Sequence, residues 1–195
     1  MNKKLKTIVL DLDATLIHSR ELRGSENNDV YKGLKNFENF YIMSDDFIVV
    51  ERPKCQKFLN YLFENFENVI VWTAASKDYA EFIIDKCIRK DENRQLSWYF
   101  FSYHCNLSED KYSSSKNLKL LTEYFDLDEC DETSICILDD YSDVANGNPG
   151  KCIIAPPFDS ENKDSSNDDF FEKLIMCFDR NMDVESINEH FQFTQ

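Results

Sequence analysis

Two aspartates, Asp11 and Asp13, stand directly after the short apolar run of residues 7–10. A buried carboxylate without a cation or hydrogen-bond donors is costly, so a pair in this position indicates a use for its charge. The spacing lets one carboxylate attack a phosphorus atom while the other passes protons to the leaving group and to water. A Mg²⁺ ion would neutralise both carboxylates and the phosphate that they face.

Polar side chains also end two later apolar runs. Thr73 follows residues 69–72, and the pair Asp139 and Asp140 follows residues 135–138. The carboxyl ends of parallel strands meet at one edge of an open α/β sheet, where ligands bind. We therefore expect these side chains to converge with the first two aspartates on one site.

The elements that must position these residues alternate between short strands and amphipathic helices. Apolar or aromatic runs predict strands within residues 5–10, 47–50, 69–72, 97–103, 135–138 and 152–154. Predicted helices open at Pro53, are capped by Ser76, follow Lys116 to Phe125, and cover about 168–179 and 183–191. The alternation predicts an α/β fold with a mainly parallel central sheet flanked by helices.

Residues 18–46 are polar and mixed and, together with the strand predicted over residues 47–50, predict a small β-rich flap over about 18–50, beside the first aspartates. Turn signals stand at residues 27–29 and 44–46, and residues 146–150 form a further turn signal. The flap carries aromatic residues that either line a groove beside the site or pack into the core: Tyr31, Phe37, Phe40, Tyr41 and Phe47.

The composition favours a packed globular protein and disfavours a nucleic-acid-binding one. The chain has 195 residues, of which 42% are hydrophobic, a size and composition that suit one domain. The net charge of −15 repels nucleic-acid backbones, whose binding depends on neutralising phosphates with Lys and Arg. The same charge favours a bound divalent cation or a cationic partner.

Cysteine usage and hydropathy indicate an intracellular protein, nuclear or cytoplasmic. The seven cysteines are an odd number without a Cys-x-x-Cys pair, which is typical of reduced, buried thiols. The first apolar run is broken by Asp11 before it reaches the length of a signal peptide, and no run approaches the length of a membrane span. We expect no membrane association and a monomer.

The motifs resemble those of a known family. Asp-x-Asp-x-Thr at residues 11–15 resembles the first motif of the haloacid-dehalogenase-like (HAD-like) phosphatases. Together with the strings at residues 10–18, 51–53, 71–80 and 137–140, it makes the chain similar to the small RNA polymerase II C-terminal-domain phosphatases, which share the FCP1 homology domain and include the NLI-interacting-factor-like proteins. The similarity covers about residues 5–180. It implies a Rossmann-like HAD fold, one domain over 1–195 and no large cap domain.

The resemblance also implies a role for each candidate residue. Asp11 matches the nucleophile that forms an aspartyl-phosphate, and Asp13 matches the general acid and base. Thr73 and Lys116 match the groups that bind phosphate. The family's Mg²⁺ site matches these residues: Asp11, Asp13 through its backbone carbonyl, Asp139 and Asp140.

Two segments depart from the family pattern. Tyr112 is followed by three serines before Lys116, so the loop is longer, and Lys111 or Lys119 is an alternative functional amine. Residues 101–105 lack the arginine expected nearby in the small phosphatases. Both departures bear on how the substrate is recognised.

The resemblance implies a Mg²⁺-dependent protein phosphatase. Its substrate would be phosphoserine or phosphothreonine in a protein or peptide, the repeats of the RNA polymerase II C-terminal domain included. One alternative is a HAD phosphatase for a small-molecule or nucleic-acid-end phosphate. The other is a non-catalytic binding module of the same fold, as in the mitochondrial import receptor subunit of this superfamily. The intact acidic residues favour an enzyme over a binding module.

Overall fold

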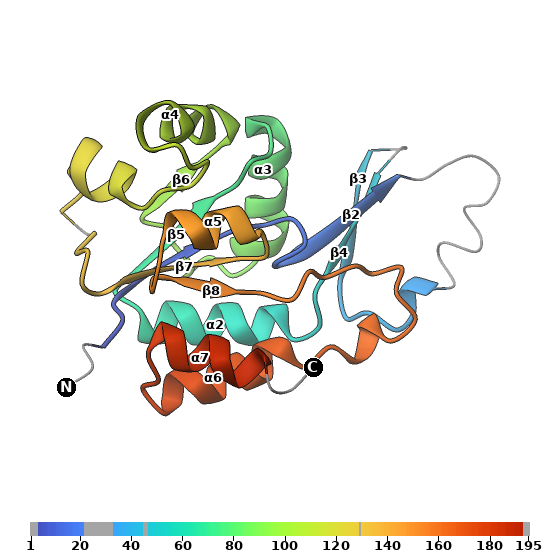
Figure 1. Ribbon diagram of the computed structural model, residues 1–195. Helices are drawn as coiled ribbons and strands as arrows, with labels where there is room; N and C mark the ends of the chain where they lie inside the picture. The colour runs from blue at the N-terminus through green and yellow to red at the C-terminus, as the bar shows by residue number, and fades with distance from the viewer. Residues whose placement is uncertain (1–3, 22–32, 45–46, 129, 193–195) are drawn as a thin grey trace.

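A five-stranded parallel sheet forms the centre of the protein. The computed structural model describes residues 4–21, 33–44, 47–128 and 130–192 (Figure 1). The strands are β1 (Thr7–Leu10), β5 (Asn68–Trp72), β6 (Trp98–Phe100), β7 (Ile135–Asp139) and β8 (Cys152–Ile154). They lie in the order β6-β5-β1-β7-β8, and every neighbouring pair is parallel. The predicted α/β fold with its mainly parallel sheet is confirmed.

Helices cover both faces of this sheet (Figure 1). On one face lie α2 (Cys55–Asn65), α6 (Phe170–Asp179) and α7 (Val184–Gln192), with α3 (Lys77–Ile83) and its π-helical continuation η2 (Ile84–Ile88) against the same core cluster. On the other lie α4 (Ser102–Tyr112), the π-helical turn η3 (Leu120–Tyr124) and α5 (Ser142–Gly147). The strands point alternate side chains to the two faces, so each face has its own hydrophobic cluster.

A small antiparallel sheet stands beside the central one and is the predicted flap (Figure 1). It contains β2 (Ile17–Glu21), β3 (Phe40–Ser44) and β4 (Phe47–Glu51), in the order β2-β4-β3. Since β1 leads through the first aspartates into β2, this sheet lies at the carboxyl edge of the parallel strands. The turn signals at 27–29 and 45–46, and Tyr31, lie outside the described residues.

Three local predictions were wrong. Pro53 does not open α2, because Lys54 follows it with a left-handed backbone (φ 64°), which delays the helix to Cys55. The segment after Lys116 is a turn, and helical structure begins only near residue 119. Residues 146–147, predicted as a turn, belong to α5.

The helix α4 was not predicted at all. Its sequence is polar and carries no apolar stripe, since only Cys105 and Ser108 are buried. Its first turn is held by the Phe101 backbone N–H, which donates to Nδ1 of His104 at 3.0 Å. Tertiary packing, rather than local hydrophobic periodicity, therefore decides this element.

Candidate active site

The register of the sheet brings the three predicted strand ends to one edge. Leu10 pairs with Val71 on one side and with Leu138 on the other. The residues that follow these positions, among them Asp11, Thr73 and Asp139, therefore leave the sheet side by side. All three are buried, with exposed fractions of 6%, 1% and 1%.

Lys116 joins the first and last of these strand ends. Its Nζ donates to Oδ1 of Asp11 at 2.6 Å and to Oδ2 of Asp139 at 2.7 Å, and the lysine is buried. The two alternative amines lie elsewhere. Lys111 is exposed, with its Nζ 4.1 Å from the centre of the Tyr124 ring, and Lys119 forms an exposed ion pair with Glu123. Of the three lysines, only Lys116 reaches the aspartates.

The serine loop before Lys116 is held by hydrogen bonds from side chains to its backbone carbonyls. Ser113 is left-handed (φ 55°), and Oγ of Ser108 donates to the carbonyl of Ser114 at 2.6 Å. Nδ2 of Asn148 donates to the carbonyl of Lys116 at 2.7 Å. Gly147 allows this close approach, because a Cβ there would lie 2.1 Å from Oγ of Ser114. The longer loop thus still delivers the amine to the sheet edge.

The acidic side chains outnumber the cations around them. Asp11, Asp139 and Asp140 each place a carboxylate oxygen within 4.8 Å of the others, and Lys116 is the only cation bonded to them in the described structure. Burial raises the pKa of Asp11 to about 7, despite the nearby Lys116. Burial and the neighbouring Asp139 also raise the pKa of Asp140. Three carboxylates with one lysine leave a surplus of negative charge, and the all-oxygen donor set suits a hard divalent cation such as Mg²⁺.

Asp13 faces a different partner from the other acids. The hydroxyl of Tyr79, on α3, donates to its Oδ1 at 2.5 Å. Burial raises the pKa of Asp13, while the Tyr79 hydrogen bond opposes that shift. Tyr79 was predicted only to lie on the helix that follows Ser76, and this polar contact was missed. A tyrosine six residues after Thr73, on a helix that begins at the site, was the available signal.

Thr73 and Thr15 supply hydroxyl groups at the same edge. The Thr73 hydroxyl accepts the backbone N–H of Ala75 at 3.1 Å, which fixes the turn after β5. Oγ1 of Thr15 lies 3.4 Å from Oδ2 of Asp11 and 3.5 Å from Oδ1 of Asp140. Thr15 therefore links two of the clustered acids, a contact that the motif alone did not assign.

Arg52 is a second residue without a role in the sequence analysis. Its guanidinium binds Asp168 through two parallel bonds, from Nε at 3.0 Å and from Nη2 at 2.8 Å. Nη1 donates to the carbonyls of Thr15 at 3.3 Å and of Pro156 at 2.9 Å. The guanidinium carbon lies 4.4 Å from the centre of the Phe170 ring. Arg52 therefore fastens the loop after the aspartate pair to the C-terminal part of the chain.

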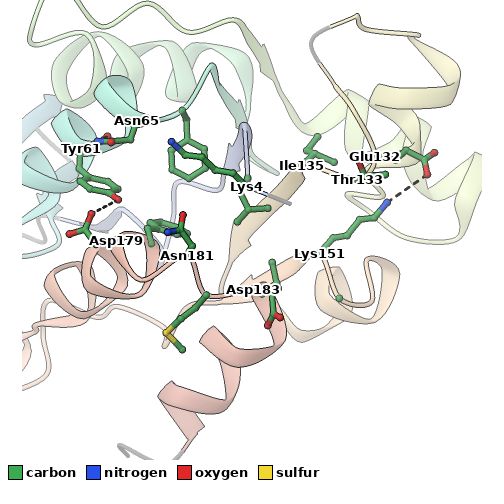
Figure 2. A pocket seen from close by; sticks show the side chains of 16 residues that line it. Lys4, Tyr61, Asn65, Glu132, Thr133, Ile135, Lys151, Asp179, Asn181 and Asp183 are labelled. Carbon is green, nitrogen blue, oxygen red and sulfur yellow. Dashed lines mark hydrogen bonds and ion pairs between the residues drawn. The ribbon is translucent and has the colours of Figure 1, made fainter. Parts of the chain in front are cut away.

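Figure 2 shows a cavity with a different set of lining residues. It measures about 470 Å³ and is lined near the amino ends of the parallel strands by Leu5 and Ile135, and by Phe66 at the end of α2. Its charged side chains include Lys4, Lys151, Glu132 and Asp179. Figure 2 shows that Lys151 pairs with Glu132 and that Asp179 bonds Tyr61. None of the clustered acids or Lys116 lines it.

The sequence is similar to those of phosphatases and phosphatase-like proteins. The sequence profile described as NLI interacting factor-like phosphatase matches residues 6–188. A CTD phosphatase-like protein of Invertebrate iridescent virus 6 is 35% identical, over 91% of this chain and 100% of its own length. The corresponding protein of Invertebrate iridescent virus 3 is 37% identical, over 86% of this chain and 91% of its own. The CTD nuclear envelope phosphatase 1 homolog of Caenorhabditis elegans is 30% identical, over 83% of this chain and 62% of its own.

Solved structures share the fold. The RNA polymerase II CTD phosphatase Fcp1 superposes with a TM-score of 0.52 at 20% identity, and the match covers 94% of this chain. The fission yeast Fcp1 bound to beryllium fluoride superposes with a TM-score of 0.53, also at 20% identity, and that match covers 92% of this chain. This chain spans about half of each, 49% and 50%. The HAD-type architecture is therefore shared.

A separate observation concerns membranes. No helix in the described residues is long and apolar enough to cross one.

Proposed function

The chain belongs to the NLI interacting factor-like phosphatase family, and we propose that it is a Mg²⁺-dependent protein phosphatase for phosphoserine or phosphothreonine. The observation that carries the proposal is the bridge from Lys116 to Asp11 and Asp139 at the carboxyl edge of the sheet. A buried lysine between two carboxylates holds one of them still and neutralises part of its charge. A third carboxylate, from Asp140, completes the oxygen set for a cation.

The proposed reaction has two steps. In the first, a carboxylate oxygen of Asp11 forms a bond to phosphorus while the bond to the serine oxygen breaks, and Asp13 gives that oxygen its proton. In the second, Asp13 takes a proton from water, the water oxygen bonds to phosphorus, and the aspartyl bond breaks to release phosphate. Lys116 and the Thr73 hydroxyl would stabilise the transferring phosphoryl oxygens. Bound Mg²⁺ would supply positive charge against the phosphate.

The acid surplus predicts a pH-dependent stabilisation by Mg²⁺. Asp11 has a pKa of about 7 in the folded protein and an ordinary value of 3.8, so the metal-free fold binds more protons than the unfolded chain between these values. The metal-free protein should therefore lose stability as pH rises from about 4 to about 7. Saturating Mg²⁺ should raise Tm by about 5 °C at pH 8 and by much less at pH 5, where protons compete for the carboxylates.

Thermal unfolding at the two pH values, with and without Mg²⁺, measures this effect. Asp139→Asn should remove most of the shift at pH 8. Asp110→Asn, which removes an exposed charge on α4, should keep it. An equal shift in wild type and Asp139→Asn would contradict the proposed cation site.

The Tyr79 hydroxyl is expected to orient Asp13 for proton transfer. Tyr79→Phe removes the hydroxyl, and with it the bond to Asp13, and keeps the ring. We expect kcat/KM, which reports the first step, to fall about tenfold for an alkyl phosphate, whose leaving oxygen needs a proton, and to change little for p-nitrophenyl phosphate. Steady-state kinetics with the two substrates measure the difference. An equal loss on both would mean that Tyr79 acts through general packing instead.

A protein segment is the proposed substrate because the flap is small and exposes apolar side chains. Phe40 is 41% exposed, Ile42 51% and Phe47 38%, which suits contact with an extended peptide beside the site. Phe37 packs on Phe158, and the Tyr41 hydroxyl bonds Glu51, so these two have structural contacts. The net charge of −15 disfavours nucleic acid. We further propose a monomer that acts in the nucleus or cytoplasm.

Turnover of phosphoserine peptides, compared with nucleotide and sugar phosphates, tests the substrate class. Higher kcat/KM on the peptides in the presence of Mg²⁺, and none with a chelator, would support the proposal. Faster turnover of a nucleotide or sugar phosphate would favour a small-molecule or nucleic-acid-end phosphatase. Absence of turnover on every substrate would favour a binding module.

A further inference from the structure

Three potential metal ligands lie together outside the phosphatase site, where the flap joins the helices. Glu51 ends β4, Cys55 begins α2 and Cys87 lies in η2. The two sulfur atoms are 3.8 Å apart, and a carboxylate oxygen of Glu51 lies within 4.8 Å of both. All three residues are buried, with exposed fractions of 3%, 1% and 0%. Residues from three separate elements therefore form one small cluster.

The carboxylate in this cluster is bonded by neutral groups. Oε2 accepts Nδ2 of Asn39 at 3.0 Å, and Oε1 accepts Nε2 of Gln56 at 2.8 Å and the hydroxyl of Tyr41. The nearby guanidinium groups are committed elsewhere, that of Arg52 to Asp168 and that of Arg94 to the side chains of Gln56 and Asn60. A buried carboxylate without a bonded cation is costly, and a bound cation would remove that cost.

The spacing of the sulfur atoms fits a tetrahedral zinc site. Two thiolates bound to a tetrahedral zinc ion, each at about 2.3 Å, lie about 3.8 Å apart. Thiolates select Zn²⁺ over Mg²⁺, and a carboxylate is an ordinary third zinc ligand. We propose that Glu51, Cys55 and Cys87 bind a structural Zn²⁺ ion, with the Tyr41 hydroxyl or a water as the fourth ligand.

Binding would exchange protons for metal. The two thiols release two protons, and the two thiolates and one carboxylate then surround the divalent ion with one surplus negative charge. The donor hydrogen bonds from Asn39 and Gln56 stabilise that charge. Since Tyr41 lies on β3 and Glu51 on β4, the ion would fasten the flap to α2 and η2. This site is separate from the all-oxygen acid cluster and does not depend on the proposed phosphatase activity.

Cobalt(II) is the probe for this site, because thiolate ligands give it strong near-ultraviolet charge-transfer absorption and carboxylates do not. The full chain is reduced with a phosphine, stripped of metal with a chelator and titrated with Co²⁺. We expect the absorption to saturate at one equivalent and to disappear when Zn²⁺ is added. A titration without thiolate absorption would overturn the proposal.

Variants identify the ligands. The double variant Cys55→Ala/Cys87→Ala should lose the absorption, whereas Cys136→Ala/Cys152→Ala, which removes two other buried thiols, should keep it. Absorption that persists in the first double variant would overturn the assignment. Glu51→Gln keeps the size of the side chain and removes its charge, and should weaken Zn²⁺ binding about tenfold or more. Should the first double variant fail to fold, unchanged affinity in Glu51→Gln would overturn the proposal instead.

Discussion

Asp11→Asn is expected to lower phosphatase turnover by about a thousandfold or more, because the amide oxygen cannot form the proposed aspartyl-phosphate. Asparagine has the same shape, so the site geometry should persist, and Lys116 keeps its bond to Asp139. Steady-state hydrolysis of p-nitrophenyl phosphate and of a phosphoserine peptide, both with Mg²⁺, measures the effect. The loss should appear in kcat on both substrates.

Thermal unfolding separates this chemical effect from misfolding. Burial raises the pKa of Asp11, so its charge destabilises the metal-free fold at pH 8, and the neutral amide should leave Tm unchanged or raise it. Asp110→Asn, on the exposed side of α4, removes the same charge and should retain full turnover. Activity in Asp11→Asn equal to wild type would exclude Asp11 as the nucleophile.

Arg52→Met is expected to lower the free energy of unfolding by about 3 kcal/mol. The change removes the two bonds from Arg52 to Asp168 and leaves two carbonyl groups without this donor, in a place where Arg52 is fully buried. The partial exposure of the Asp168 side chain, 21%, keeps the effect below that of a completely buried pair. Methionine preserves the apolar stem over Phe170, so the loss reports the guanidinium.

Urea denaturation of wild type and Arg52→Met gives the difference directly. Arg89→Met is the matched control, since Arg89 is exposed, pairs with Asp85 one helical turn away and also lies over an aromatic ring, that of Tyr99. Its stability should equal that of wild type within error. A similar loss in both variants, or none in Arg52→Met, would contradict the bridging role of Arg52.

The framework of the site follows from sequence because it depends on short-range patterns. The three apolar runs that lead into Asp11, Thr73 and Asp139 became parallel strands, and Leu10 between Val71 and Leu138 places their ends together. The position of Lys116 could not be read from periodicity. It depends on the left-handed backbone of Ser113, on the hydrogen bond from Asn148 and on the close approach at Gly147. The last two are contacts between segments that lie far apart in the sequence, so helical periodicity does not reveal them.

The missed contacts have a common physical cause. Tyr79 and Arg52 each stand in segments whose apolar neighbours explain their position, so the hydrogen-bonding end of the side chain left no pattern in the sequence. The bond from Tyr79 to Asp13 joins residues 66 positions apart, and the bonds from Arg52 to Asp168 join residues 116 apart. Such partners are set by the packing of whole elements. The start of α2 differs for a local reason, the backbone of Lys54.

Trapping the phosphorylated enzyme tests the central claim, that Asp11 is the nucleophile of a phosphatase, most directly. The enzyme is mixed with a phosphoserine peptide and Mg²⁺, quenched with acid during turnover, and treated with borohydride, which reduces an acyl phosphate to an alcohol. Peptide mass spectrometry should then find homoserine at position 11, dependent on the phosphopeptide and on Mg²⁺. Turnover with unmodified Asp11, or a phosphoryl group on another residue, would contradict the account.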